Sequence, residues 1–335
     1  VAVAIDASGL TGTGDFTLVS TSSLLSGSSV KGTANLDTIA IGTTNGTTYE
    51  TFGGNDVFTG ALAALVATGE DDTVISAGAG TADKITLSDT TLTLTDNHFT
   101  NMTGMEILVG TSTSGAFTVT TGTAFNTAFA GGATISTGTI AASVAASVNF
   151  QAGLANMDVT FTVDAVDMDG AAGGEDTTIV TGSGADTITF TGDATYVGAV
   201  GDAGTISVSS GSGIDTISIT TGTIVAQTNS QSVIVNAGTG ADVITIVSVY
   251  ADTVQSTALI VIDAGDSLTT ARDTLTGADI ATANLFGTGF DFSGVSTVGT
   301  LGTSNDFGTI ATHNVTAGVV LFDDASTYAA ELVIN

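Results

Sequence analysis

Apolar and polar residues alternate along much of the chain, in short stretches bounded by glycine. Segments 215–219 (DTISI) and 242–246 (DVITI) place an apolar residue at every second position, and segments 117–120 and 159–163 alternate in the same way. Successive side chains of a strand point to opposite faces of a sheet, so this pattern predicts short β-strands with one buried face. The abundance of β-branched Thr and Val also favours strands.

One motif recurs between pairs of these predicted strands: Gly-x-Gly-x-Asp. It occupies residues 182–186, 211–215 and 238–242, and a partial copy lies at 261–265 (VIDAG). The first glycines lie at 182, 211, 238 and 265, which gives spacings of 29, 27 and 27 residues. A fixed period in the range of 20 to 50 residues is typical of solenoids and repeat arrays.

The repeat predicts an all-β fold, an irregular right-handed parallel β-helix (β-solenoid) whose coils each have three short strands and three turns. Smaller β-sandwich-like segments would flank it. The expected regions are an N-terminal β segment (1–50), a β-rich region with sparse motifs (51–170), the repeats proper (171–280) and a C-terminal β segment or cap (281–335). The stretch 104–160 lacks the motif but keeps strand alternation.

Aligned coils would stack the motif aspartates Asp186, Asp215 and Asp242 in one file. Stacked strands lie about 4.8 Å apart, and carboxylates repel one another substantially at that distance unless a cation lies between them. The sequence therefore predicts metal ions on these turns. Weaker copies of the motif, or carboxylates beside it, add further candidate metal ligands: Asp56, Asp71, Asp72, Asp83, Asp176, Asp263 and Asp266.

The charge balance strengthens this expectation. Lys and Arg together number 3 and Asp and Glu 33, a formal net charge of −30 in 335 residues. Such a chain lacks the basic side chains that phosphates and anionic membranes attract, so neither nucleic acid nor a membrane surface is expected as a partner. It has no Cys, which excludes disulfides and thiolate metal sites. No apolar run is long enough to predict a membrane-spanning helix.

Calcium is the cation that these residue types favour. It takes six to eight oxygen ligands from carboxylates, backbone carbonyls and water, and glycine-rich turns with aspartate offer that set. Zinc prefers His and Cys, and the chain has only His98 and His313. The alternative is that Gly-x-Gly-x-Asp is turn chemistry alone, because Asp and Gly favour turns in any case.

At these residues the sequence resembles the RTX family of type I-secreted bacterial proteins, whose glycine-rich nonapeptides form calcium-binding β-helices. More closely, it resembles RTX-like bacterial surface-layer (S-layer) proteins, and segment 102–109 (MTGMEILV) is similar to their connectors between repeats. The resemblance covers about residues 50–110 and 170–280. It implies calcium ligands from two adjacent coils, at Gly182, Gly184, Asp186, Gly211, Gly213, Asp215, Gly238, Gly240 and Asp242. The repeats here are not contiguous nonapeptides, which favours an irregular β-helix over a continuous roll.

No catalytic arrangement is evident in the sequence. Neither histidine belongs to a His-Glu-x-x-His motif, and there is no Gly-x-Ser-x-Gly elbow. The Gly-x-Gly pairs precede Asp and a strand, whereas a dinucleotide-binding loop continues into a helix. Adjacent pairs such as Asp71–Asp72 and Asp323–Asp324 would point to opposite faces of a strand, which argues against shared glycosidase chemistry. We therefore do not expect an enzyme.

The leading hypothesis is an extracellular, calcium-binding structural protein, a self-assembling subunit of a bacterial surface layer or a secreted filament. The expected partners are further copies of the chain, with cell-surface polysaccharide as a possible anchor. The alternative is a calcium-dependent adhesin, or the repeat region of a larger one. Carboxylates near the ends of the chain are candidates to share calcium between subunits: Asp6, Asp15, Asp37, Asp291, Asp306, Asp323 and Asp324.

Overall fold

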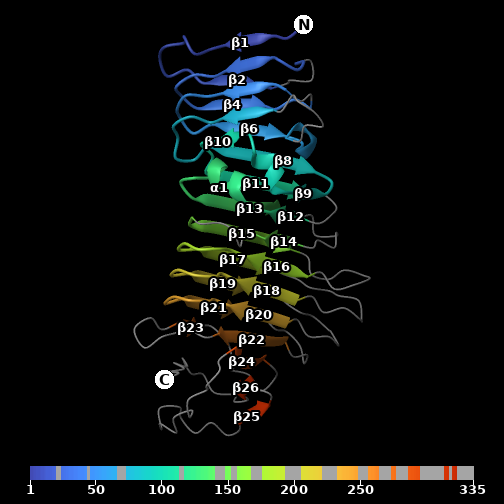
Figure 1. Cartoon of the computed structure of the whole chain (residues 1–335), viewed down its shortest axis with the longest axis vertical. Coiled ribbons are helices and arrows are strands. Elements are labelled where there is room, and N and C mark those ends of the chain that lie inside the picture. The colour runs from blue at the N-terminus through green and yellow to red at the C-terminus, as the bar shows by residue number, and fades with distance from the viewer. Residues whose placement is uncertain are drawn as a thin grey trace.

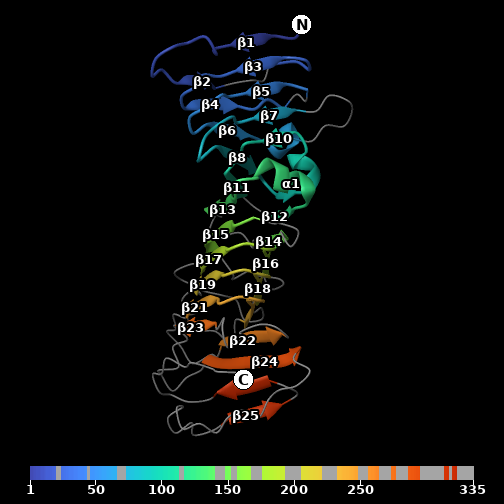
Figure 2. The same cartoon turned by 60° about the vertical axis from the view of Figure 1, so that its left-hand side comes forward.

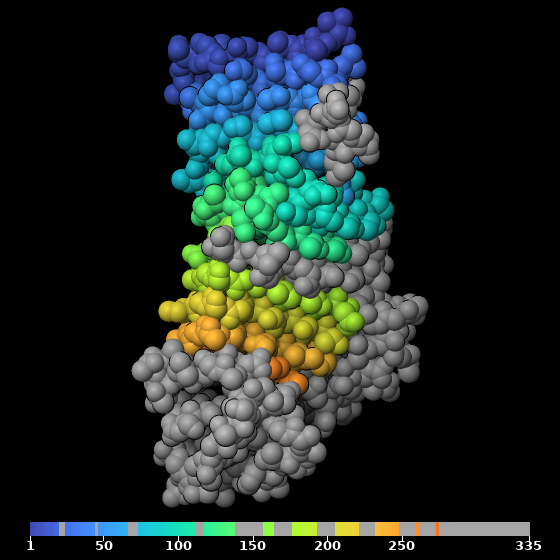
Figure 3. Space-filling model, in the orientation of Figure 1, coloured from blue at the N-terminus to red at the C-terminus, as the bar shows by residue number. Residues whose placement is uncertain are grey.

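The chain folds into an elongated parallel β-solenoid whose strands stack along its long axis (Figure 1). The computed structural model describes residues 1–19, 24–43, 46–65, 73–112, 117–139, 148–151, 157–166, 176–192, 205–220, 232–247, 256–263, 273–276, 286–294, 313–316 and 319–322. A space-filling view shows the coils as successive layers (Figure 3). The predicted all-β parallel β-helix is therefore confirmed.

Three sheets make up the solenoid. The five-stranded sheet contains β1 (Ala4–Asp6), β3 (Ser29–Lys31), β5 (Thr48–Glu50), β7 (Val74–Ser76) and β10 (Met102–Thr103). The eleven-stranded sheet contains β2 (Phe16–Leu18), β4 (Asp37–Ala40), β6 (Val57–Gly60), β8 (Lys84–Asp89), β11 (Ile107–Ser112), β13 (Ala133–Thr139), β15 (Val159–Val166), β17 (Thr187–Gly192), β19 (Thr216–Thr220), β21 (Val243–Val247) and β23 (Thr274–Thr276).

The ten-stranded sheet contains β9 (Leu92–Leu94), β12 (Phe117–Thr120), β14 (Val148–Gln151), β16 (Thr177–Val180), β18 (Thr205–Ser209), β20 (Ser232–Asn236), β22 (Ser256–Asp263), β24 (Phe286–Gly294), β26 (Val319–Phe322) and β25 (His313–Thr316). Neighbouring strands pair in parallel up to β24, whereas β26 pairs antiparallel with both β24 and β25. The parallel pattern thus ends with an antiparallel unit at the C-terminal end of this sheet.

Alternation along the strands builds the core. In β19 the side chains of Ile217 and Ile219 are fully buried, and in β18 those of Ile206 and Val208 are buried as well. The residues between them face outward and remain partly exposed. Because neighbouring strands pair in register, each apolar side chain lies over its counterpart in the next coil, as in Ile188, Ile217 and Ile244. One apolar core therefore runs through the coils from Leu24 to Ile260.

The solenoid changes its second sheet in the middle. The five-stranded sheet ends at β10, and the ten-stranded sheet begins at β9, within the same coil. The short helices η2 (Asp96–Phe99) and α1 (Thr123–Ala128) lie at this change, with α1 between β10 and β12 in Figure 2. A further short helix, η1 (Leu62–Ala64), precedes it. The rings of Phe99 and Phe125 meet edge to face with centroids 5.2 Å apart.

The expected three strands occur in the coil that contains β8, β9 and β10. A coil such as that of β16 and β17 has two strands among its described residues, and residues 193–204 of it lie outside the described part. For the motif-free stretch 104–160, the sequence allows either a continuation of the solenoid or a sandwich, and the structure shows the continuation: β11, β13 and β15 belong to the eleven-stranded sheet. Across the described ranges, no helix is long and apolar enough to span a membrane.

Candidate functional site

A column of acidic residues runs along the eleven-stranded sheet, at the start of its strands. Each residue is either the first residue of a strand or the one just before it. The strand register places one residue of each coil directly over the next. We call the acidic members the acidic column. It consists of an N-terminal run, Asp37, Asp56, Asp83 and Glu106, and a C-terminal run, Asp186, Asp215, Asp242 and Asp273. Ala133 and Val159 occupy the two positions between the runs.

Each carboxylate of the column holds the backbone of the coil before it. The backbone N–H of Asp186 donates to Oδ1 of Asp215 at 2.9 Å, and the N–H of Asp215 donates to Oδ1 of Asp242 at 2.8 Å. The N–H of Asp242 donates in turn to Oδ1 of Asp273 at 3.0 Å. These bonds join residues 27 to 31 positions apart in sequence.

The N-terminal run repeats this arrangement. The N–H of Asp37 donates to Oδ1 of Asp56 at 2.8 Å, and that of Asp56 donates to Asp83 at 2.6 Å. The last bond of the run uses a longer side chain, because the N–H of Asp83 donates to Oε2 of Glu106 at 2.8 Å. The coil length varies from 19 to 27 residues within this run, yet the register of the column is kept.

Most aspartates of the column share an unusual feature at their second carboxylate oxygen, Oδ2. Oδ2 is buried and has no hydrogen-bond partner in five of the described aspartates: Asp56, Asp83, Asp186, Asp215 and Asp242. Burying such an atom without a donor is unfavourable by about 1–3 kcal/mol, and by more for a charged group. Asp37 differs, because its Oδ2 accepts the N–H of Thr33 at 2.7 Å. A proton, a water molecule or a cation would satisfy Oδ2 of these five aspartates, whereas Oδ2 of Asp37 already has a donor within the chain.

Burial also makes these carboxyl groups harder to ionise. Desolvation raises the pKa of Asp83 to about 6, and the nearby carboxylates of Asp56 and Glu106 add to the effect. Desolvation likewise raises the pKa of Asp56, Asp186 and Asp215, although a hydroxyl near each one partly offsets it. An ionised column without a counterion is thus a source of instability in the native state.

Glycine makes room around the carboxylates. A Cβ at Gly80 would lie about 2.5 Å from Oδ2 of Asp83, and one at Gly240 would lie 2.8 Å from Oδ1 of Asp242. A Cβ at Gly213 would overlap the carbonyl oxygen of Gly184 in the preceding coil, and Gly213 has a φ of +142°. Successive turns therefore approach so closely that their backbone carbonyls and the carboxylates come together. A side chain at these glycine positions would clash with them.

This donor set fits a hard cation bound between coils. Two adjacent coils offer two carboxylates, about 4.8 Å apart along the stack, and backbone carbonyls of the glycine turns. Among the residues that the structure describes, no three or more His, Cys, Asp or Glu side chains converge on one point. A cation here would thus take most of its ligands from backbone carbonyls and water. Calcium tolerates that coordination better than zinc does.

The structure brings part of the predicted metal set together. Asp186, Asp215 and Asp242 stack in one column as predicted, and Asp56 and Asp83 belong to the same column. Asp176 does not belong to it, because it precedes β16 of the ten-stranded sheet, is exposed and accepts the N–H of Thr205 at 3.0 Å. Three further candidates lie outside the described residues: Asp71, Asp72 and Asp266.

Two other expectations are changed by the register. Asp263 ends β22 of the ten-stranded sheet and pairs with Gly294, so the partial motif at 261–265 is not the next member of the column. Asp273 takes that place. Asp37, which we considered for contacts between subunits, is fully buried and bonded within its own chain, so it cannot reach another copy. Asp291 lies in β24, and Asp306, Asp323 and Asp324 lie outside the described part.

Sequence reasoning missed Asp37, Glu106 and Asp273. None of them follows a Gly-x-Gly pair, yet each directly precedes or begins a strand of alternating apolar residues. Segments 37–40 (DTIA) and 273–276 (DTLT) resemble the strand starts of the repeats, and that similarity is the signal that could have found them. Glu106 lay within the segment noted as a connector.

The histidines lie away from the column. His98 is in η2, where its Nδ1 lies 3.0 Å from the backbone nitrogen of Thr95, and burial lowers its pKa. His313 begins β25. Comparisons of the chain with protein-family models, with curated proteins and with solved structures found no match.

Proposed function

We propose that the protein is an extracellular calcium-binding structural protein, which assembles with further copies of itself into a surface layer or a filament. Calcium would bind along the acidic column, between successive glycine turns. Its chemical role there would be to neutralise the carboxylates and to cross-link adjacent coils.

The buried, unpartnered Oδ2 atoms carry this proposal. They occur in five aspartates that stand in register at the same position of their coils. A single orphaned oxygen has many explanations, but five in one column indicate a common requirement. The resemblance of the glycine turns to RTX repeats supports calcium as the species that meets it.

A purely structural role is the competing explanation. The Oδ1 atoms already bind backbone N–H groups, and the column could hold the coils together with protonated carboxyl groups. That explanation fits Asp37, whose oxygens find donors within the chain. It does not fit Asp83 at neutral pH, because the raised pKa of that group, about 6, leaves it mostly ionised at pH 7.

The proposed extracellular location and the proposed self-assembly are both supported by the chemistry of calcium binding. Sites built from few carboxylates, carbonyls and water bind calcium weakly, in the range typical of extracellular modules, and would be empty at cytosolic calcium concentrations. A solenoid of stacked coils also presents flat outer sheet faces on which further copies can pack. Calcium would lower the net charge of −30 that keeps two copies apart.

Isothermal titration of the chain with calcium tests this proposal. Asp215→Asn keeps an oxygen for the N–H of Asp186 but removes the charge, so we expect the calcium stoichiometry to fall or the affinity to drop at least about tenfold. Asp176→Asn is the matched control, because Asp176 is exposed and outside the column; its titration should equal that of the wild type. If Asp215→Asn binds calcium as the wild type does, the column does not hold the ion.

A further inference from the structure

The outer face of the eleven-stranded sheet carries an ordered array of small side chains. Two outward columns run along it, two residues apart on each strand, with the register keeping both in line. We call them together the threonine face. The first column is Thr38, Val57, Lys84, Ile107, Thr134, Thr160, Thr187, Thr216, Val243 and Thr274. The second is Ala40, Thr59, Thr86, Val109, Ser136, Thr162, Thr189, Ser218 and Thr245.

This face is accessible and almost uncharged. Its side chains from Thr38 to Val243 and from Ala40 to Thr245 are half-buried or exposed, so no described residue covers them completely. Val243 is 38% exposed although it is apolar. Lys84 is the one charged residue in the two columns, and its positive charge would attract a partner of net charge −30. The two columns contain no carboxylate, and the exposed Asp158 lies at their edge, two residues before Thr160, where its Oδ1 accepts the N–H of Ala185.

We propose that the threonine face is the surface through which two copies of the chain contact each other. This inference rests on the proposed self-assembly and names the surface responsible for it. Two chains of charge −30 repel each other, and contact costs least where neither copy presents a carboxylate. Flat sheets with β-branched side chains pack face to face about 10 Å apart.

The size of the face suits a weak contact that is repeated many times. The ten strands that contribute to the threonine face lie about 4.8 Å apart and span roughly 43 Å, and two outward columns with their side chains are about 10 Å wide. A face-to-face contact would therefore bury about 900 Å² in total, in the range of weak, transient interfaces. Such a contact is marginal for an isolated dimer but is reinforced when each subunit makes several contacts in an assembly.

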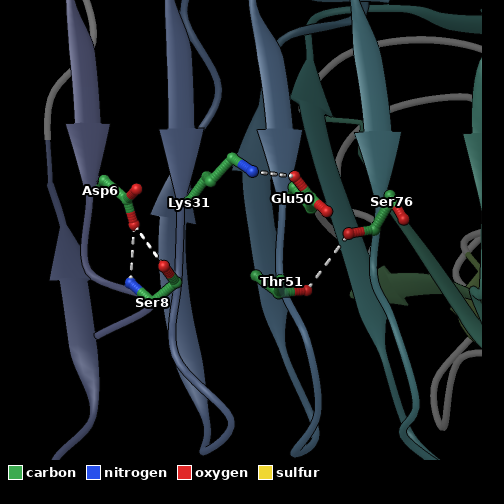
Figure 4. A network of polar contacts seen from close by, with 6 residues as sticks. All are labelled: Asp6, Ser8, Lys31, Glu50, Thr51 and Ser76. Carbon is green, nitrogen blue, oxygen red and sulfur yellow. Dashed lines mark hydrogen bonds and ion pairs between the residues drawn. The ribbon is translucent and has the colours of Figure 1, made fainter. Parts of the chain in front are cut away.

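The outer face of the five-stranded sheet suits a partner of the same charge less well. On the five-stranded sheet, Asp6, Lys31 and Glu50 stand in one row across three strands, and Lys31 Nζ lies 3.1 Å from Glu50 (Figure 4). Desolvating these charges against a second copy would be unfavourable. The outer face of the ten-stranded sheet is the competing surface, because its described outward positions in β16, β18 and β20 also carry no carboxylate, and it mixes Ser207 and Asn236 with Val180 and Ile234. These positions lack the positive charge that Lys84 gives to the threonine face.

Sedimentation velocity of the calcium-loaded chain over a range of concentrations tests the inference. Ser218→Glu places a carboxylate in the middle of the threonine face, and we expect it to weaken association at least about tenfold by like-charge repulsion. Ser207→Glu is the matched control: it is the same substitution in the same coil, at a half-buried outward position of the ten-stranded sheet. It should associate as the wild type does. Circular dichroism would establish that both variants are folded. Thr189 pairs with Ser218 on the neighbouring strand, so Thr189→Glu provides a second test of the same surface.

The outcomes separate the inference from the proposed function. If the wild type assembles and Ser218→Glu and Thr189→Glu assemble equally well, the threonine face is not the contact, although self-assembly stands. If Ser207→Glu is the variant that loses association, the contact lies on the ten-stranded sheet and the inference is wrong. If the calcium-loaded wild type stays monomeric at all concentrations, the proposed self-assembly fails and the inference fails with it.

Discussion

At the scale of single residues, the protein depends on aspartates that have two different tasks. One oxygen of each described column aspartate accepts a backbone N–H from the coil before it, as Asp215 does for Asp186. The other oxygen is buried and has no donor in five of them. Oδ1 links adjacent coils through a hydrogen bond within the chain, which needs no ion. Oδ2 has no such bond, so the stability of the folded coils depends on whether a proton or a cation binds it.

The raised pKa values predict an unusual pH dependence in the absence of calcium. Because the folded-state pKa of Asp83 is about 6, above its unfolded value near 3.9, its contribution to stability is complete below about pH 4 and is lost as the pH rises through 6. Asp56, Asp186 and Asp215 shift in the same direction. In chelator, the melting temperature should therefore fall between pH 4.5 and pH 7.5.

Thermal melts in chelator at several pH values would measure this effect. Asp83→Asn removes the titrating group, so its melting temperature should fall less than that of the wild type over the same interval. Added calcium should restore the wild type most at the higher pH, where the carboxylates are ionised. A melting temperature that rises with pH in chelator would contradict the assigned direction.

At the scale of the elements, the turn and the strand that follows it are the unit of the fold. The Gly-x-Gly-x-Asp spacing predicted the strands β17, β19 and β21 and their stacking, because glycine turns and alternation are both local signals. Asp37 and Asp273 escaped prediction because their position is defined by the register between coils, and their turns lack the glycine pair. At the change from the five-stranded to the ten-stranded sheet, Phe99 packs against Phe125, and no local pattern of the sequence predicts that contact.

The turn glycines give a direct test of the close approach between coils. An alanine at Gly213 would overlap the carbonyl oxygen of Gly184 and would have to adopt a φ of +142°. We expect Gly213→Ala to destabilise the calcium-loaded protein by at least about 2 kcal/mol. Denaturant unfolding measures this, with Gly131→Ala as the control, because nothing lies within 4 Å of a Cβ at Gly131. Equal midpoints for the two variants would show that the coils do not approach as described.

At the scale of the whole molecule, the fold is a stack of layers that carries a net charge of −30 with one continuous core. Each site that binds an ion only in the native state stabilises it by about 2.7 kcal/mol at a hundredfold excess over Kd. Several such sites together are comparable with the total stability of about 5–15 kcal/mol that is typical of a domain. Bound calcium would therefore determine whether the coils stay folded. Magnesium would replace calcium poorly, because it keeps its bound waters and requires strict octahedral coordination.

The most direct test of this account is the thermal unfolding of the full chain at pH 7.5, followed by circular dichroism in calcium, in chelator and in magnesium at equal ionic strength. We predict a folded β-rich protein with a high melting temperature in calcium. In chelator we predict a much lower melting temperature or an unfolded chain, and in magnesium only slight recovery. Superimposable spectra and melting curves in calcium and in chelator would contradict the central claim that calcium neutralises the acidic column.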